Sequence, residues 1–98
     1  MTLQVWLDTQ LELGQTLLVP YMKNINDIQV DYSISLSMSG KSGTSRIKQG
    51  GKVDALAAEP TALSRMRIRL QKEDACHIEL VLRSGGKELG TYHFDCQQ

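Results

Sequence analysis

The sequence has 98 residues, of which 41% are hydrophobic and 22% charged, so its composition is globular and excludes a disordered chain. Its 11 basic residues balance its 11 acidic residues, so net charge does not indicate a nucleic-acid partner. No hydrophobic run approaches the ~20 residues of a membrane span, and the start, Met1-Thr2-Leu3, has no signal-peptide pattern. We expect one domain, residues 1–98, in a mature form without its export signal. We expect no membrane or nucleic-acid partner.

The first twenty residues allow two interpretations. Hydrophobic residues at every second position from Leu3 to Leu7 are typical of a strand. Leu3, Leu7 and Leu11 also have the spacing of a helix that ends at Gly14. We favour strands, because a hydrophobic run follows Gly14 directly, as it does after a turn. Pro20 is expected at a sheet edge or a strand end, because proline lacks the N–H that a ladder needs.

The clearest strand runs from Ile28 to Ser39, where hydrophobic and polar residues alternate without a break. Its polar face includes a row of four serines, namely Ser33, Ser35, Ser37 and Ser39. We interpret this row as a small solvated face, with a flat docking surface as the alternative.

The middle of the chain is rich in glycine, at positions 40, 43, 50 and 51 around Arg46-Ile47-Lys48. Glycines punctuate elements, so this part predicts a loop, a short strand and a turn. A further strand is predicted from Lys52 to Ala58, where Glu59-Pro60 ends it.

Two later segments alternate again, over residues 65–70 and 76–83, and a turn at residues 84–87 leads to a last strand with Tyr92 and Phe94. The chain thus has about seven short strands separated by turn signals. This pattern predicts an all-β fold, an immunoglobulin-like β-sandwich of about seven antiparallel strands. The cysteine and tryptophan landmarks of antibody domains are absent.

Face parity predicts the register of the last hairpin. Both strands have their hydrophobic residues at even numbers, and a turn centred on Gly86 places Cys76 opposite Cys96. A disulfide is then geometrically possible, and its loop of about 20 residues is worth roughly 3 kcal/mol. Two unbridged thiols are the alternative. A catalytic redox pair is not expected, because there is no Cys-x-x-Cys motif and no helix N-terminus.

The same register places His77 opposite Asp95 and Glu79 opposite His93 on one outer face. Imidazole and carboxylate groups bind zinc. However, the spacing matches no standard metal motif, so we expect charged cross-strand contacts and no metal. The sequence predicts no catalytic residues, no enzyme and no cofactor.

A basic row follows in the segment that alternates over residues 65–70. Arg65, Arg67 and Arg69 project from one face about 7 Å apart. Three like charges repel one another, so an anionic partner or nearby carboxylates would explain them. The alternative is that exposed charges prevent edge-to-edge aggregation. A second basic group would enlarge the surface if its strands lie nearby: Arg46, Lys48 and Lys52.

The segment from Ser39 to Gly51 resembles the loop and short strand of the periplasmic curli chaperones, the CsgC/CsgH family. Its end, Lys48-Gln49-Gly50-Gly51, is similar to the CsgH branch in particular. The likeness extends to Leu56-Ala57-Ala58, the turn at residues 60–63, the alternating segment from Met66 and the Gly85-Gly86 hairpin. It covers most of the chain and is strongest from Tyr32 to Phe94.

The resemblance implies an immunoglobulin-like sandwich in the bacterial periplasm. It also implies a protein that keeps the unfolded major curli subunit from forming amyloid, and we expect a monomer. One branch of the family has a Cys-x-Cys pair near the start of the long strand. Ile28 and Val30 occupy the matching positions here, so a redox role tied to that pair is not implied.

Three functional hypotheses follow. The first is an amyloid-inhibiting chaperone whose client contacts are, first, Arg65, Arg67 and Arg69 and, second, Arg46, Lys48 and Lys52. The second is an immunoglobulin-like structural or adhesion module of a cell-surface assembly. The third is a thiol-disulfide redox protein, which would require Cys76.

Overall fold

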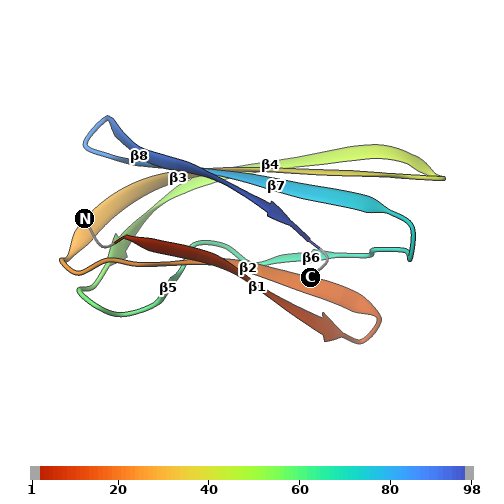
Figure 1. The fold of residues 1–98 in the computed structure, drawn as a ribbon, viewed down its shortest axis with the longest axis horizontal. Coiled ribbons are helices and arrows are strands. Elements are labelled where there is room, and N and C mark those ends of the chain that lie inside the picture. Colours follow the sequence, from red (N-terminus) through yellow and green to blue (C-terminus); the bar gives the residue numbers. More distant parts are fainter. Residues whose placement is uncertain (1–2, 97–98) are drawn as a thin grey trace.

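The computed structural model describes residues 3–96, which form two four-stranded antiparallel sheets stacked in two layers (Figure 1). Sheet A consists of β1 (Gln4–Glu12), β2 (Gln15–Lys23), β5 (Thr61–Ala62) and β6 (Met66–Ile68). Sheet B has the order β4-β3-β7-β8 and consists of β3 (Ile28–Gly40), β4 (Gly43–Ala55), β7 (Ala75–Ser84) and β8 (Lys87–Asp95). The architecture is an immunoglobulin-like β-sandwich, which confirms the predicted fold class.

Met1 and Thr2, at the start that showed no signal-peptide pattern, lie outside the described residues. Among the residues that the structure describes, no helical segment has the length and hydrophobicity needed to traverse a bilayer.

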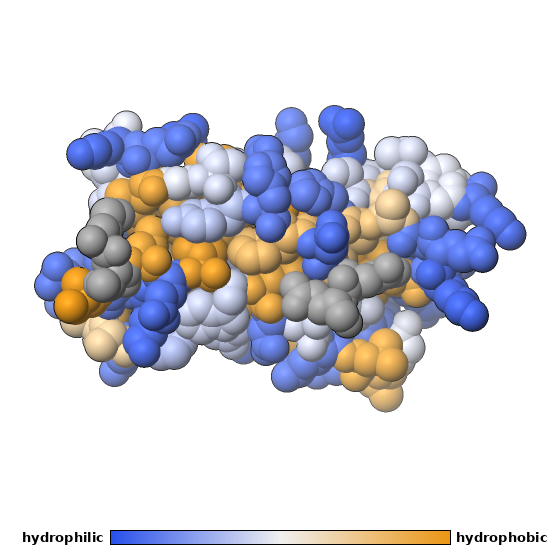
Figure 2. Space-filling view, in the orientation of Figure 1, coloured by the Kyte–Doolittle hydropathy of each residue, from blue (hydrophilic) through white to orange (hydrophobic). Residues whose placement is uncertain are grey.

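The core lies between the sheets and is formed by every second side chain of the long strands. Val30, Ile34 and Leu36 of β3 are at most 1% exposed, and sheet A closes over them with Leu18 and Met22 of β2. Burying one such side chain contributes about 1.5–3 kcal/mol, so the alternating pattern largely determines which face of each strand is inside. Figure 2 shows hydrophobic side chains in a band between the layers.

The N-terminal segment is a hairpin of two strands, which confirms the strand interpretation over the helix. β1 and β2 are joined by Leu13-Gly14, and both residues have positive φ values, of 49° and 79°. This conformation suits the right-handed twist of the flanking strands and favours asparagine or glycine at the first position. Leu13 is instead a fully exposed leucine, and with Leu11 it forms the hydrophobic patch at this turn (Figure 2).

Replacing Leu13 with asparagine is therefore expected to stabilise the protein by about 0.5–1 kcal/mol, because asparagine tolerates positive φ at lower cost than leucine. Urea unfolding should show a higher midpoint with an unchanged slope. The matched variant Leu11→Asn, in the adjacent strand, should show no gain. A midpoint that stays unchanged in Leu13→Asn would contradict this account of the turn.

The prediction that Pro20 lies at a sheet edge or strand end is wrong. Pro20 is buried inside β2, which has β1 on one side and β5 and β6 on the other. Its carbonyl accepts a hydrogen bond from the Leu63 N–H, with an N–O distance of 2.8 Å, so its nitrogen faces the same side. On that side β2 pairs with β6 up to Leu18 and with β5 from Tyr21, and the proline occupies the gap between them.

The predicted loop is confirmed by the turn at Lys41-Ser42 between β3 and β4. The predicted turn at Gly50-Gly51 is wrong, and so is the division into a short strand and a separate strand from Lys52 to Ala58. β4 runs without interruption from Gly43 to Ala55 and pairs with β3 along its whole length. Gly51 does not turn the chain. A Cβ atom at this position would lie 2.7 Å from the Tyr32 hydroxyl, so the glycine makes room for the Tyr32 ring of the neighbouring strand. With β5 and β6 counted separately, residues 3–96 form eight strands instead of about seven.

The predicted register of the final hairpin is confirmed. Ile78 pairs with Phe94, and the ladder between β7 and β8 keeps this register until a bulge between Leu82 and Arg83. The predicted strand over residues 65–70 is shorter, since β6 covers only Met66–Ile68, but its face parity is correct.

Candidate functional site

The three arginines of the basic row project from the outer face of sheet A. β6 contains Arg67, while Arg65 and Arg69 directly flank the strand, and all three are exposed. Arg67 forms an ion pair with Glu12 of β1, with an N–O distance of 3.6 Å. The row is therefore partly offset by an acidic residue, and Arg65 and Arg69 have no ion pair within residues 3–96.

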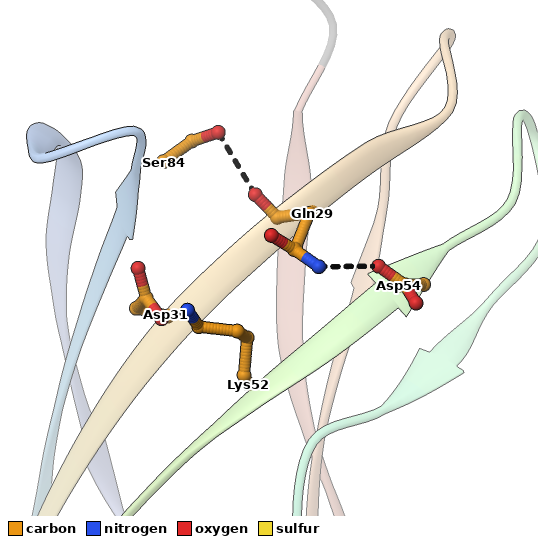
Figure 3. Close-up of polar contacts among 5 residues, drawn as sticks. All are labelled: Gln29, Asp31, Lys52, Asp54 and Ser84. Atoms are coloured by element: carbon orange, nitrogen blue, oxygen red, sulfur yellow. Dashed lines mark hydrogen bonds and ion pairs between the residues drawn. The ribbon is translucent and has the colours of Figure 1, made fainter.

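The second basic group lies on β4. Arg46, Lys48 and Lys52 are exposed and share the outer face of sheet B, because the odd-numbered residues of β4 face sheet A. Lys52 forms an ion pair with Asp31 of β3, with an N–O distance of 3.6 Å (Figure 3). Arg46 and Lys48 form no ion pair with any carboxylate of the described part.

The two basic groups are not one surface. Sheet A and sheet B turn their outer faces in opposite directions (Figure 1), so the arginines at β6 and the cations of β4 lie on opposite sides of the sandwich. The second group was expected to enlarge the first only if its strands lie nearby, and this condition is not met. Alternation fixes the face within a strand but not the sheet to which the strand belongs.

Polar contacts tie one end of β4 to its neighbours (Figure 3). The Gln29 side-chain amide donates a hydrogen bond to Asp54 of β4 at 3.0 Å, and the Ser84 hydroxyl of β7 donates to the Gln29 carbonyl at 2.8 Å. The Gln29–Asp54 hydrogen bond and the Lys52–Asp31 ion pair hold the Ala55 end of β4 to β3, and the Ser84 contact ties β3 in turn to β7. The free cations Arg46 and Lys48 lie farther along β4, towards the β3–β4 turn.

The serine row of β3 separates two kinds of side chain on the outer face of sheet B. Ser37 lies between Arg46 and His77, and Ser35 between Lys48 and Glu79. Strands are about 4.8 Å apart, so the basic side chains of β4 and the acidic and imidazole groups of β7 start about 10 Å apart. The small serines leave shallow grooves between them, one of about 460 Å³ bordered by Ser37, Arg46 and His77.

The structure joins Cys76 and Cys96 in a disulfide, with a Cα–Cα distance of 5.3 Å. Both cysteines contribute to the hydrophobic core, and there is no free thiol among residues 3–96. The bond ties the start of β7 to the residue that follows β8. Its position is therefore that of a buried cross-link, without an exposed sulfur for exchange chemistry.

The histidines lie next to this cross-link on the outer face. His77 and His93 stack with centroids 5.2 Å apart, and His77 Nε2 lies 3.1 Å from His93 Nδ1. His77 Nδ1 is 3.7 Å from an Asp95 carboxylate oxygen, so the register prediction for this pair is confirmed. Within residues 3–96 there is no group of three or more His, Cys, Asp or Glu residues arranged to hold a metal ion.

Sequence reasoning missed the role of Gly50 and Gly51, which it assigned to a turn. A signal was present, because the alternation of Arg46 and Lys48 with Ile47 continues on the far side of the glycines, with Lys52 outside and Val53 inside. That continuity predicts one strand with an exposed, side-chain-free stretch in its middle.

Comparisons with known proteins agree with this architecture. Residues 1–93 match the family Tafi-CsgC, described as thin aggregative fimbriae synthesis protein. The E. coli curli protein CsgC has 18% identity and a TM-score of 0.79, with 99% of this chain and 100% of that chain covered. The solution structure of R. palustris CsgH has 20% identity and a TM-score of 0.80, with 98% and 94% covered. No curated protein matches the sequence.

Proposed function

We propose that this chain, which belongs to the Tafi-CsgC family of thin aggregative fimbriae synthesis proteins, is a chaperone of the major curli subunit. Membership of this family gives it a role in curli assembly. The chaperone binds the unfolded subunit transiently and delays its conversion to amyloid. It acts as a monomer, without a cofactor. The family is not a known enzyme family, and the described surface needs no catalytic group for this activity.

The observation that carries this proposal is the set of exposed cations without an acidic partner within residues 3–96. Arg46 and Lys48 on sheet B and Arg65 and Arg69 on sheet A are all solvated. Charges of this kind attract an oppositely charged, unfolded client and raise the rate of encounter more than the final affinity. They also disfavour edge-to-edge pairing between copies of the sandwich itself. We assign client binding to these four residues. Arg67 and Lys52 also belong to the proposed client surface, but an ion pair offsets the charge of each.

We place the protein in the periplasm. The Cys76–Cys96 disulfide supports this location, because disulfides persist in oxidising compartments and are rare in the cytosol. An antibody against the chain should therefore detect it in the fraction released by outer-membrane permeabilisation. Its retention with cytosolic markers would contradict the assignment.

The experiment that tests the function is a thioflavin-T time course of the unfolded major curli subunit with this protein well below equimolar amounts. We expect a long extension of the lag, because a transient binder acts on many subunits in turn. A lag that does not change would exclude chaperone activity and favour the structural or adhesion module, which binds a folded partner stably and does not act at low stoichiometry.

A further inference from the structure

β4 is the outer strand of sheet B and pairs with β3 on one side only. It has 13 residues, whereas the other two long outer strands, β1 of sheet A and β8 of sheet B, have 9 residues each. An outer strand offers a row of unpaired N–H and C=O groups to another chain. β4 is thus the longest open edge of the described sandwich.

The geometry indicates which backbone groups of β4 are free. The Gln29 carbonyl accepts from Ser84 of β7, so odd-numbered residues of β3 direct their backbone groups towards β7 and even-numbered ones towards β4. The Tyr32 carbonyl agrees, since it lies 3.3 Å from the place that a Cβ of Gly50 would occupy. Tyr32 pairs with Gly51, so the backbone groups of Gly50 point to the open edge. By the same alternation, the backbone groups of Arg46, Lys48 and Lys52 also point to the open edge.

The middle of this edge is exposed, and next to it the Ser64 hydroxyl donates a hydrogen bond to the Gln49 side-chain oxygen from the sheet A side. Gly50 and Gly51 are exposed, and Gly50 has no side chain on the outer face of the sheet. Neither glycine has a positive φ, so a turn does not explain them. A glycine inside a strand often marks the close approach of another backbone, and here the open edge is the side from which such a backbone can approach.

Charge selects the kind of partner. β4 carries three basic residues, Arg46, Lys48 and Lys52, against the single acidic Asp54. β1 has two acidic residues and no basic one, and β8 has one lysine against two acidic residues. A strand that bears carboxylates is therefore attracted to β4 and repelled by β1. A second copy of this chain would bring three cations against three cations, which disfavours self-pairing along β4.

We propose that β4 binds an extended polypeptide segment bearing carboxylates by strand addition, with the backbone of Gly50 at the centre and the side chains of Arg46 and Lys48 as its ionic contacts. The proposal rests on the proposed function in that this segment would belong to the client. Beyond that function, the proposal specifies which strand binds the client, which backbone contact is made and that the bound segment is acidic.

Gly50→Pro tests the backbone contact. Proline removes the N–H at the open edge and puts a ring there, while the hydrogen bonds of Gly51 to β3 remain. Gly50→Ala is the matched control, because it places a Cβ against the same Tyr32 carbonyl but keeps the N–H. The probe is a blocked ten-residue peptide of alternating threonine and glutamate, whose binding is followed by amide shifts and hydrogen exchange. We expect about tenfold weaker binding by Gly50→Pro and near-normal binding by Gly50→Ala.

A second measurement does not depend on either variant. In the unsubstituted protein, the peptide should slow the hydrogen exchange of the Arg46, Lys48, Gly50 and Lys52 amides and leave the β1 and β8 amides unchanged. Protection of β1 or β8 instead, or equal peptide binding by a folded Gly50→Pro variant, would overturn the proposal. If the peptide protects β4 but the protein does not delay amyloid, the function is wrong and the strand addition stands. If Gly50→Pro delays amyloid as well as the unsubstituted protein, the strand addition is wrong and the function stands.

Discussion

The double substitution Arg46→Glu/Lys48→Glu is expected to raise the amount of protein needed for a given lag extension by about tenfold to a hundredfold. The change reverses two charges that no carboxylate of residues 3–96 offsets. Each reversal replaces an attraction to client carboxylates by a repulsion, and exposed pairs are worth about 0.2–1 kcal/mol each. The measurement is a thioflavin-T dose series with the major curli subunit.

The matched control is Arg65→Glu/Arg69→Glu, which makes the same change of charge on the opposite face of the sandwich. All four residues are exposed and lack an ion pair in the described part, so the two variants should unfold within about 0.5 kcal/mol of the parent. We expect a smaller loss for the arginine pair, because these residues steer the client without lying next to the open edge of β4. A larger loss for the arginine pair would assign the client surface to sheet A.

The second large effect concerns stability. Replacing both Cys76 and Cys96 with alanine is expected to lower the free energy of unfolding by about 3 kcal/mol, because the disulfide closes a loop with a sequence separation of 20 residues. This is a large part of the ~5–15 kcal/mol that stabilises an ordinary domain. Urea unfolding monitored by Trp6 fluorescence gives the value, and reduction of the parent should produce a similar loss.

The same variant separates the chaperone from the redox hypothesis. Both sulfurs belong to the hydrophobic core, so we expect the alanine variant to delay amyloid normally at temperatures where it remains folded. A variant that is folded but no longer delays amyloid would favour thiol-disulfide exchange. A loss of less than about 1 kcal/mol would show that the cross-link contributes little to the fold.

Alternation made the sheet faces predictable. The period of two from Ile28 onward identified β3 and its buried side, and the even-numbered faces of the last two strands determined their register. Burial of one face is the dominant free-energy term in a strand, so such patterns survive folding. The all-β class and the juxtaposition of Cys76 and Cys96 follow from this pattern alone.

The positions of Gly51 and Pro20 were predicted wrongly, because the structural role of each residue depends on the neighbouring strand. Gly51 was assigned to a turn, but it accommodates the Tyr32 ring of β3. Pro20 was expected at an edge, but its nitrogen faces the gap between β6 and β5. Both outcomes require knowledge of pairings between segments far apart in the sequence. For the same reason, no spacing rule indicated that Arg46 and Arg67 lie on opposite faces.

The most direct test of an electrostatically guided chaperone is the lag extension at two ionic strengths. Raising ionic strength from about 0.05 M to about 0.5 M shortens the Debye length from roughly 14 Å to about 4 Å and screens exposed charges. The measured quantity is the lag of the major curli subunit with the protein, divided by the lag without it at the same salt. We predict that this ratio is large at the lower ionic strength and falls at least severalfold at the higher one. A ratio that stays the same or rises with salt would contradict guidance by the exposed cations and indicate binding through hydrophobic surface.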